Sequence, residues 1–438
     1  MTWLSVIKSF LFKKKKTKVP KQPIIQEEIP KQVQKLGRDF TSQVVKILIR
    51  DGLINNKSVV CSPSLIDAVL RILAVGAKNS TLEEELLRAL GHANVEELNA
   101  ASFEFADVLN DSSDDEDDED DDGEYEEDEE DYEPVISYVN ALLLDQRFGL
   151  DNLFQKVLKD VHDTEARAVD FRNQADEVVN QANSWAEEQT KGLIKQFLTT
   201  NHIQDDTVSL LTNALHFKGI YRSKFYKECT KDDEFHLLTG DKIRVPFMNQ
   251  GYKHYEYGTF DDCQVLRIPY ESFNYTVKRF SMYIFLPNEI NGLPNLIENI
   301  KIDRNLFKDE GRFKLHCARI KRISIPIFNL ESDFSLKTGM KQLGLTLPFE
   351  ATCNDFSSII GGSHPLYVND VVQKCRVENN EQVSKVATNS TCSCRCEVSY
   401  VGLGSPTIVF LANRPFMFMI REDVSSALLF IGSVLDPK

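Results

Sequence analysis

The sequence lacks the short motifs that identify common enzyme classes. It contains no GxSxG, no HExxH, no phosphate-binding GxxxxGK(S/T) and no GxGxxG. Its eight histidines are scattered, and His216, within an apolar stretch, fits a structural role. We therefore expect a protein that is not an enzyme. An unrelated hydrolase stays open as a minor alternative, because the residues of a catalytic triad follow no fixed order along a chain.

Paired cysteines are also missing. The nine cysteines are an odd number and are scattered singly, except for Cys392, Cys394 and Cys396. No CxxC pair and no Cys/His cluster at zinc spacing occurs, so we expect no cofactor, no metal site and no disulfide framework. A reducing compartment is the simpler inference. Metal binding by the alternating triplet is a minor alternative, since three thiols are one ligand short of a closed tetrahedral site.

A secretory signal is absent from the N-terminus. The apolar residues 1–12 come before the basic cluster Lys13 to Lys18, which reverses the order of a signal peptide. We expect an intracellular protein, in the cytoplasm, with the nucleus open because the basic cluster fits a localisation patch. Export by a non-classical route is the alternative. Residues 1–35 are predicted to be a disordered extension or an amphipathic, basic segment that contacts a membrane surface.

No proline-, glycine- or serine-rich linker divides the chain, so we expect one large domain over residues 36–438. The net charge is −16, yet residues 111–133 hold eighteen acidic residues and no basic one. The rest of the chain carries about +2, and no specific nucleic-acid contact is predicted. Residues 110–134 should form a disordered, solvated insertion, because like charges repel and have little to bury. The alternative is that this acidic segment binds a basic protein partner.

Residues 384–397 alternate in character from one residue to the next. Every charge lies at an odd position, namely Lys385, Arg395 and Glu397. The even positions are small or β-branched and uncharged. Successive residues of a strand face opposite sides, so this segment can become a strand with one buried and one wet face. It is predicted to be a loop that can enter a sheet.

Local signals predict several regular elements. The apolar runs 415–420 and 427–434 indicate two buried strands of a C-terminal hairpin. Residues 62–63 open a helix with proline at its first position, and residues 81–84 read as a capping box for the next helix. Residues 208–217 are apolar enough for a central strand. Asn213 is its exception, and a buried asparagine requires a hydrogen-bond partner.

Three separated motifs resemble the serpin family. They are CSPSLIDAVLRILAVGAKNST at residues 61–81, LTNALHFKGIYRSKF at residues 211–225, and RPFMFMIREDVSSALLFIGSVLDP at residues 414–437. The resemblance covers residues 35–438 and implies the α+β serpin fold: helices around a large central β-sheet, with a second sheet, a C-terminal hairpin and an exposed reactive-centre loop. It also implies a protease inhibitor whose partner is a serine protease, with a cysteine protease as an alternative. The protease cleaves the loop, and the loop then inserts into the sheet.

The resemblance implies a hinge and a sheet-opening cluster. Glu381 matches the hinge glutamate, but Val383 stands where inhibitors usually carry glycine. The alternative therefore stays open that this is a non-inhibitory serpin, which binds or chaperones other proteins through its acidic tract or N-terminus. Ser384 and Val386 suit burial. The implied sheet-opening residues are Ser62, Asn213, Gln373 and Tyr221. Gln373 replaces the usual histidine and Tyr221 the usual tryptophan. Glutamine can still bridge Ser62 and Asn213, but it cannot become charged.

The reactive bond follows from a count of residues. In inhibitory serpins about seventeen residues, counted from the hinge glutamate, precede the cleaved bond, which implies the bond Glu397–Val398. Spacing from Pro415 places the bond nearer Gly404, so this loop is about seven residues longer than usual. We place the extra residues after the bond, because residues 400–406 have the glycine and proline content of a loop. Cleavage after Arg395, before Cys396, or after Tyr400 is the alternative.

Deletion of residues 111–133 should leave the melting temperature within about 3 °C of the wild-type value, because loop length enters the closure entropy only logarithmically. Thermal unfolding followed by circular dichroism measures this. Loss of the folded state on deletion would show that the acidic run is structural.

Overall fold

The structure is a computed structural model. It describes residues 36–109, 135–271, 278–303, 306–307, 311–381 and 408–438, apart from Arg38 and Ser363. The predicted terminal extension and acidic insertion therefore lie outside the described residues.

The described residues form two β-sheets with helices packed around them. One sheet has five strands in the order β10-β11-β4-β2-β3, and the other has nine strands, β1-β14-β13-β8-β7-β6-β9-β12 with β5 beside β6. The strands are β1 Val59–Cys61, β2 Val135–Asp145, β3 Glu165–Val169, β4 Ser209–Lys218, β5 Lys231–His236, β6 Lys242–Thr259, β7 Cys263–Pro269, β8 Phe280–Pro287, β9 His316–Pro326, β10 Phe328–Ser335, β11 Asp370–Asn379, β12 Ile408–Leu411, β13 Phe416–Glu422 and β14 Leu428–Val434. This confirms the predicted α+β class.

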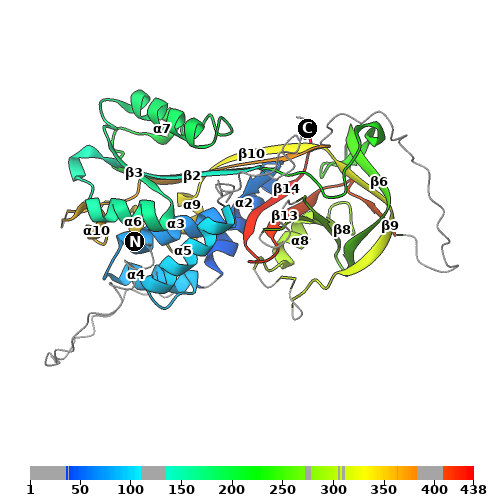
Figure 1. The fold of residues 1–438 in the computed structure, drawn as a ribbon, viewed down its shortest axis with the longest axis horizontal. Helices are drawn as coiled ribbons and strands as arrows, with labels where there is room; N and C mark the ends of the chain where they lie inside the picture. The colour runs from blue at the N-terminus through cyan, green and yellow to red at the C-terminus, as the bar shows by residue number, and fades with distance from the viewer. Residues whose placement is uncertain are drawn as a thin grey trace, which may run out of the picture.

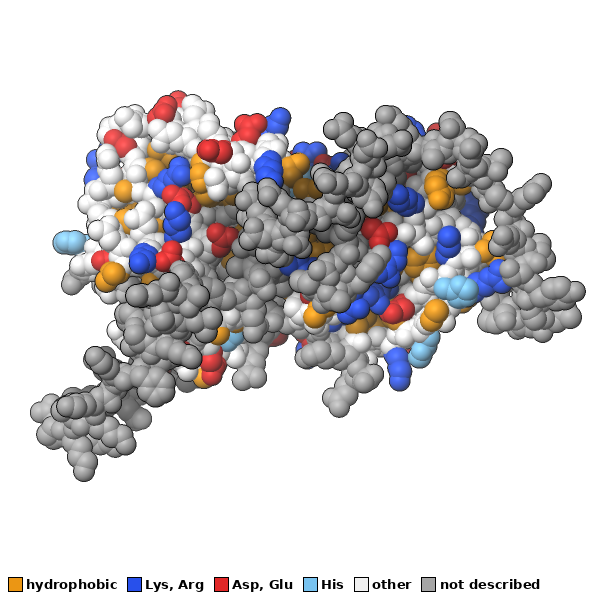
Figure 2. Space-filling view, viewed as in Figure 1, with side chains coloured by type: hydrophobic (Ala, Val, Ile, Leu, Met, Phe, Trp, Pro, Cys, Tyr) orange, Lys and Arg blue, Asp and Glu red, His pale blue; other side chains and the backbone are white. Residues whose placement is uncertain are grey.

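The five-stranded sheet separates α7 from the other helices near it (Figure 1). The helices are α2 Phe40–Ile54, α3 Pro63–Gly76, α4 Thr81–Leu90, α5 Val95–Leu109, α6 Asn152–His162, α7 Ala175–Gln189, α8 Leu293–Asn299, α9 Lys337–Gln342 and α10 Ser357–Ile360. Among these helices none is both long and apolar enough to cross a membrane. On the face seen in Figure 2, acidic and basic side chains are interspersed over the described surface.

Helix α3 begins as the sequence predicts. The Ser62 hydroxyl accepts a hydrogen bond from the Leu65 amide at 3.2 Å, and Pro63 occupies the first helical position. The predicted cap of α4, however, is wrong by one residue. The cap is Ser80, whose hydroxyl accepts from the Glu83 amide at 3.2 Å. Two adjacent hydroxyl residues offered the same signal, and only one lies outside the helix.

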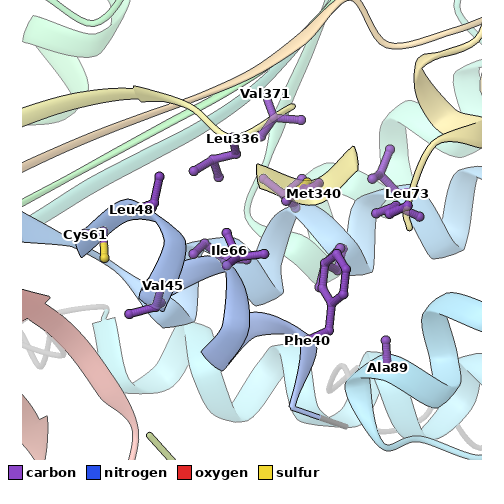
Figure 3. Close-up of a cluster of buried hydrophobic side chains, with 14 of the residues drawn as sticks. Phe40, Val45, Leu48, Cys61, Ile66, Leu73, Ala89, Leu336, Met340 and Val371 are labelled. Carbon is purple, nitrogen blue, oxygen red and sulfur yellow. The ribbon is translucent and has the colours of Figure 1, made fainter. Parts of the chain in front are cut away.

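Both faces of the five-stranded sheet are buried at its centre. Leu210 and Ala214 of β4 pack against α7 on the outer face, with Val178 and Ala182 among their neighbours. The inner face packs on α2, α3 and α9 (Figure 3). The close-up shows a cluster of buried side chains from these elements, from α4, β1 and β11, and from the residue that precedes α9: Phe40, Val45, Leu48, Cys61, Ile66, Leu73, Ala89, Leu336, Met340 and Val371. A strand buried on both faces is a near-continuous apolar run, which residues 208–217 are.

The predicted C-terminal hairpin of two buried strands is present in the nine-stranded sheet, where β14 lies beside the edge strand β1 and β13 follows it. β13 and β14 pair antiparallel from Phe416↔Val434 to Ile420↔Phe430. β1 pairs with β14, and a Cβ at Gly432 would lie 2.5 Å from the carbonyl oxygen of Val59. Glycine is therefore required for this close approach.

Buried His162 should make the fold sensitive to acid. It ends α6 with 8% of its surface exposed, and burial with the nearby Arg71 guanidinium lowers its pKa to about 4. The unfolded state then binds more protons between pH 6.5 and 4, so its contribution to stability, roughly 2–3 kcal/mol, is lost as pH falls through that window. Urea unfolding at pH 7 and pH 4.5 should show a smaller pH dependence in His162→Gln than in the wild type.

The exposed His254 supplies the control, since His254→Gln should retain the wild-type pH dependence. Equal pH dependence in wild type and His162→Gln would contradict the assignment.

Candidate functional site

The candidate site is the seam between β4 and β11, by which we mean the line along which these two strands pair. They run parallel from Asp370↔Leu210 to Glu378↔Lys218. β11 pairs antiparallel with β10 on its other side, and β4 pairs antiparallel with β2. Beyond β11 the chain continues through Glu381 and returns at β12 in the other sheet. The seam therefore lies beside the strand from which residues 382–407 depart.

On the inner face of the seam, two polar side chains are fixed to the first turn of α3. The Gln373 side chain accepts from the Ser62 amide at 2.9 Å and donates to the Ser62 carbonyl at 3.1 Å. The Asn213 amide donates to the Leu65 carbonyl at 3.1 Å. Gln373 and Asn213 are partners in the strand register. The two strands of the seam are therefore fastened separately to one helical turn.

This arrangement corrects the expected role of Gln373 as a bridge between Ser62 and Asn213. Gln373 bonds to the backbone of Ser62, whose hydroxyl is occupied as the helix cap. The side-chain Oδ1 of Asn213 has no hydrogen-bond partner among the described residues. The link thus runs through the backbone at the start of α3. The Ser62 N–H has no partner within the helix, and the Ser62 carbonyl accepts from both Gln373 and the Ile66 amide.

The thiols around Gln373 are buried. The Cys375 sulfur lies 3.7 Å from the Gln373 side-chain oxygen, and burial raises the pKa of this thiol well above its ordinary value. Burial also raises the pKa of Cys61. Neither Cys61 nor Cys375 forms a disulfide with another of the described residues. These two thiols act as small apolar groups, because the thiolate form that reacts is disfavoured.

Tyr221 lies apart from Ser62, Asn213 and Gln373. Its hydroxyl donates to the Asn379 side chain, and its ring stacks on Tyr270 with centroids 4.8 Å apart. Asn379 is six residues beyond Gln373, or about 20 Å along a strand. Burial raises the pKa of the Tyr221 phenol, so it remains a protonated donor. Tyr221 therefore fastens the far end of β11.

The hinge begins at the edge of the described residues. Glu381 follows Asn379 closely, and one of its carboxylate oxygens is buried without a hydrogen-bond partner among the described residues. The other predicted hinge and reactive-bond residues lie outside the described residues: Val383, Ser384, Val386, Arg395, Cys396, Glu397, Val398 and Tyr400.

Sequence reasoning missed one contact across the seam. His216, interpreted as a structural histidine, places its Nε2 3.3 Å from the Glu378 carboxylate on β11. The available signal was that Arg376 and Glu378 recur with period two in an otherwise buried strand, which places both on one face. Only the register of the sheet shows that this face meets His216.

The chain is similar to known proteins over most of its length. Residues 35–437 match the family described as Serpin (serine protease inhibitor). Serpin-Z10 of Arabidopsis thaliana is 32% identical over 394 residues, covering 87% of this chain and 92% of that protein. Serpin-Z7 of Hordeum vulgare is 31% identical over 391 residues, covering 87% and 90%.

Solved structures agree in fold. The structure of Arabidopsis AtSerpin1, described as a native stressed conformation, is 28% identical with a TM-score of 0.76 and covers 93% of this chain and 99% of that chain. Uncleaved ovalbumin, 21% identical with a TM-score of 0.73, covers 92% and 100% and shows the fold alone. From the family match, the relatives and the two-sheet architecture, we conclude that this chain belongs to the serpin family of protease inhibitors.

Proposed function

We propose that the protein inhibits a serine protease by trapping it through cleavage and insertion of the loop between β11 and β12. The protease hydroxyl attacks a loop carbonyl, the peptide bond breaks, and the new amino terminus leaves while the acyl-enzyme remains. The loop segment that begins at Glu381 then enters the seam with the protease attached. The chain acts as an inhibitor, with no catalytic role of its own.

The parallel pairing of β4 and β11 is the observation that carries this proposal. A segment that leaves the end of β11 and folds back runs antiparallel to β11. Since β4 is parallel to β11, the same segment is antiparallel to β4 as well. An inserted strand would therefore exchange one parallel ladder for two antiparallel ones. The alternation of residues 384–397 supplies one face for each side of the sheet.

Entry of a strand requires the seam to part at Gln373 and Asn213. Each hydrogen bond to the α3 turn contributes about 1 kcal/mol net, and both side chains are almost fully buried. Parting of the two strands therefore costs a few kcal/mol at these contacts, which slows the opening of the seam but still allows it. Because glutamine does not titrate, we expect this inner-face contact to be independent of pH.

A non-inhibitory binding or chaperone role is the second candidate. Val383 favours it, since a β-branched residue is stiff where the chain must bend. In that role the acidic residues 110–134 would hold a basic protein partner, or residues 1–35 would contact a membrane surface. We further propose that the protein acts inside the cell, in the cytoplasm or the nucleus, because its nine cysteines do not have the spacing of a disulfide framework and Lys13 to Lys18 fit a localisation patch.

The cleaved bond should be Glu397–Val398, selecting a protease that prefers acidic residues. Incubation with acidic-, basic- and aromatic-specific proteases should yield an SDS-stable complex whose released fragment starts at Val398. A fragment that starts at Cys396, Val401 or Gly404 would refute the count from Glu381. If no protease in the panel forms a complex, the non-inhibitory role is favoured instead.

Val383→Gly should raise the ratio of trapped complex to cleaved inhibitor. The expected increase is about two- to fivefold, which corresponds to the roughly 0.5–1 kcal/mol that distinguishes glycine in backbone freedom. Densitometry of the products at fixed protease measures this ratio. Val401→Gly, beyond the predicted bond, is the matched control and should leave it unchanged. An unchanged or lower ratio in Val383→Gly would show that the hinge does not limit insertion.

A further inference from the structure

The outer face of the seam changes character along its length. Near the start of β11 it is apolar, because Leu210 and Ala214 of β4 lie beneath α7. Further along, β11 places Lys374, Arg376 and Glu378 on this face, opposite the side that carries Gln373. The last part of the seam is therefore polar outside.

His216 is the β4 residue that meets these charges. It is 2% exposed, and its Nε2 lies 3.3 Å from the Glu378 carboxylate. Arg376 contacts the same carboxylate oxygen at 3.0 Å. In the strand register His216 is opposite Arg376, and Glu378 is opposite Lys218. The contact between His216 and Glu378 therefore runs diagonally across the seam.

A neutral His216 ring can donate a hydrogen bond to the Glu378 carboxylate. Burial is the largest influence and lowers the pKa of the imidazole, while Glu378 raises it and Arg376 and Lys218 lower it. The lowered pKa favours the neutral ring at pH 7, and we assign its hydrogen to Nε2 because a carboxylate oxygen can only accept. The other nitrogen, Nδ1, has no hydrogen-bond partner among the described residues. Among the described residues, the hydrogen bonding of the His216 ring is thus directed to Glu378 on the opposite strand of the seam.

A neighbouring ion pair shows the contrast. Lys374 lies 2.9 Å from Glu331, which joins β11 to β10. The ladder between β10 and β11 stays intact when a strand enters the seam, so this pair is unaffected. The pair of His216 and Glu378 must separate.

We propose that His216 and Glu378 form a latch on the outer face of the seam, which limits how fast the seam opens and admits a strand. It complements the inner-face contacts of Gln373 and Asn213 with α3. This inference rests on the proposed function for its consequence, since a latch matters only where a strand enters. The opening itself is a property of the free protein and can be measured without a protease.

Hydrogen–deuterium exchange of the full chain tests the latch. We compare wild type with His216→Phe and Glu378→Ala, and use Glu331→Ala as the matched control. Amides of β4 and β11 should exchange about ten- to a hundredfold faster in the two latch variants, as expected for loss of a hydrogen bond to a charged group. Amides of β13 and β14, and the seam amides of Glu331→Ala, should keep wild-type rates.

A second measurement connects the latch to strand entry. A synthetic peptide with the sequence of residues 381–397 is added, and its stable incorporation is followed by native electrophoresis. Incorporation should be faster in His216→Phe and Glu378→Ala by a similar factor, and the double variant should gain little more than either single one.

The results separate the latch from the proposed function. Unchanged seam exchange in His216→Phe, faster exchange throughout the fold, or an equal effect of Glu331→Ala would each overturn the latch. If seam exchange accelerates as expected and no protease forms a covalent complex, the latch stands and inhibition fails. If complexes form and seam exchange is unchanged, inhibition stands and the latch fails.

Discussion

The two hydrogen bonds between the Gln373 side chain and the Ser62 backbone are the contact on which the arrangement of both sheets depends. Ser62 follows β1, which pairs with β14 at one edge of the nine-stranded sheet. The amide of Val60 in the same strand donates to the Ser332 hydroxyl of β10 at 3.0 Å. Residues 59–65 thus connect the C-terminal hairpin, the five-stranded sheet and α3. A movement of β11 relative to β4 is therefore resisted by residues 59–65, which contact both sheets.

The two faces of the seam are held by different chemistry. On the inner face, neutral side-chain amides bond to backbone groups at the start of α3, where the Ser62 N–H donates to Gln373 and the Ser62 and Leu65 carbonyls accept. On the outer face, the Glu378 carboxylate accepts from His216 and forms an ion pair with Arg376. Neutral contacts in a dry interior keep their strength as pH changes, whereas a histidine–carboxylate contact depends on protonation. The protein thus combines a pH-independent restraint with one that can titrate.

Local sequence signals predicted the elements well and their partners poorly. The strand at residues 208–217, the C-terminal hairpin and the start of α3 were found because each carries its own apolar run or cap. A contrasting case is Ile327, which separates β9 of one sheet from β10 of the other. Nothing in a local pattern states which sheet a strand joins.

The candidate site shows the same division between local and long-range information. Ser62, Asn213 and Gln373 were identified by resemblance, and their proximity depends on a register between strands about 160 positions apart. The contact of His216 with Glu378 arises from the same register, and that of Tyr221 with Asn379 lies just beyond its end. A one-residue shift would turn His216 to the other face. Such contacts follow only once the pairing is known.

The contacts at the end of the seam where the chain leaves β11 control the start of strand entry, although each contributes little free energy. In the proposed mechanism the inserted strand forms two antiparallel ladders, so the final state is favoured once a segment is free to enter. The intact loop is anchored at β11 and at β12, in different sheets, and full insertion is opposed by that anchoring. What must be prevented before cleavage is partial opening from the β11 end. Tyr221 with Asn379, and His216 with Glu378, lie at that end, where a strand would begin to enter.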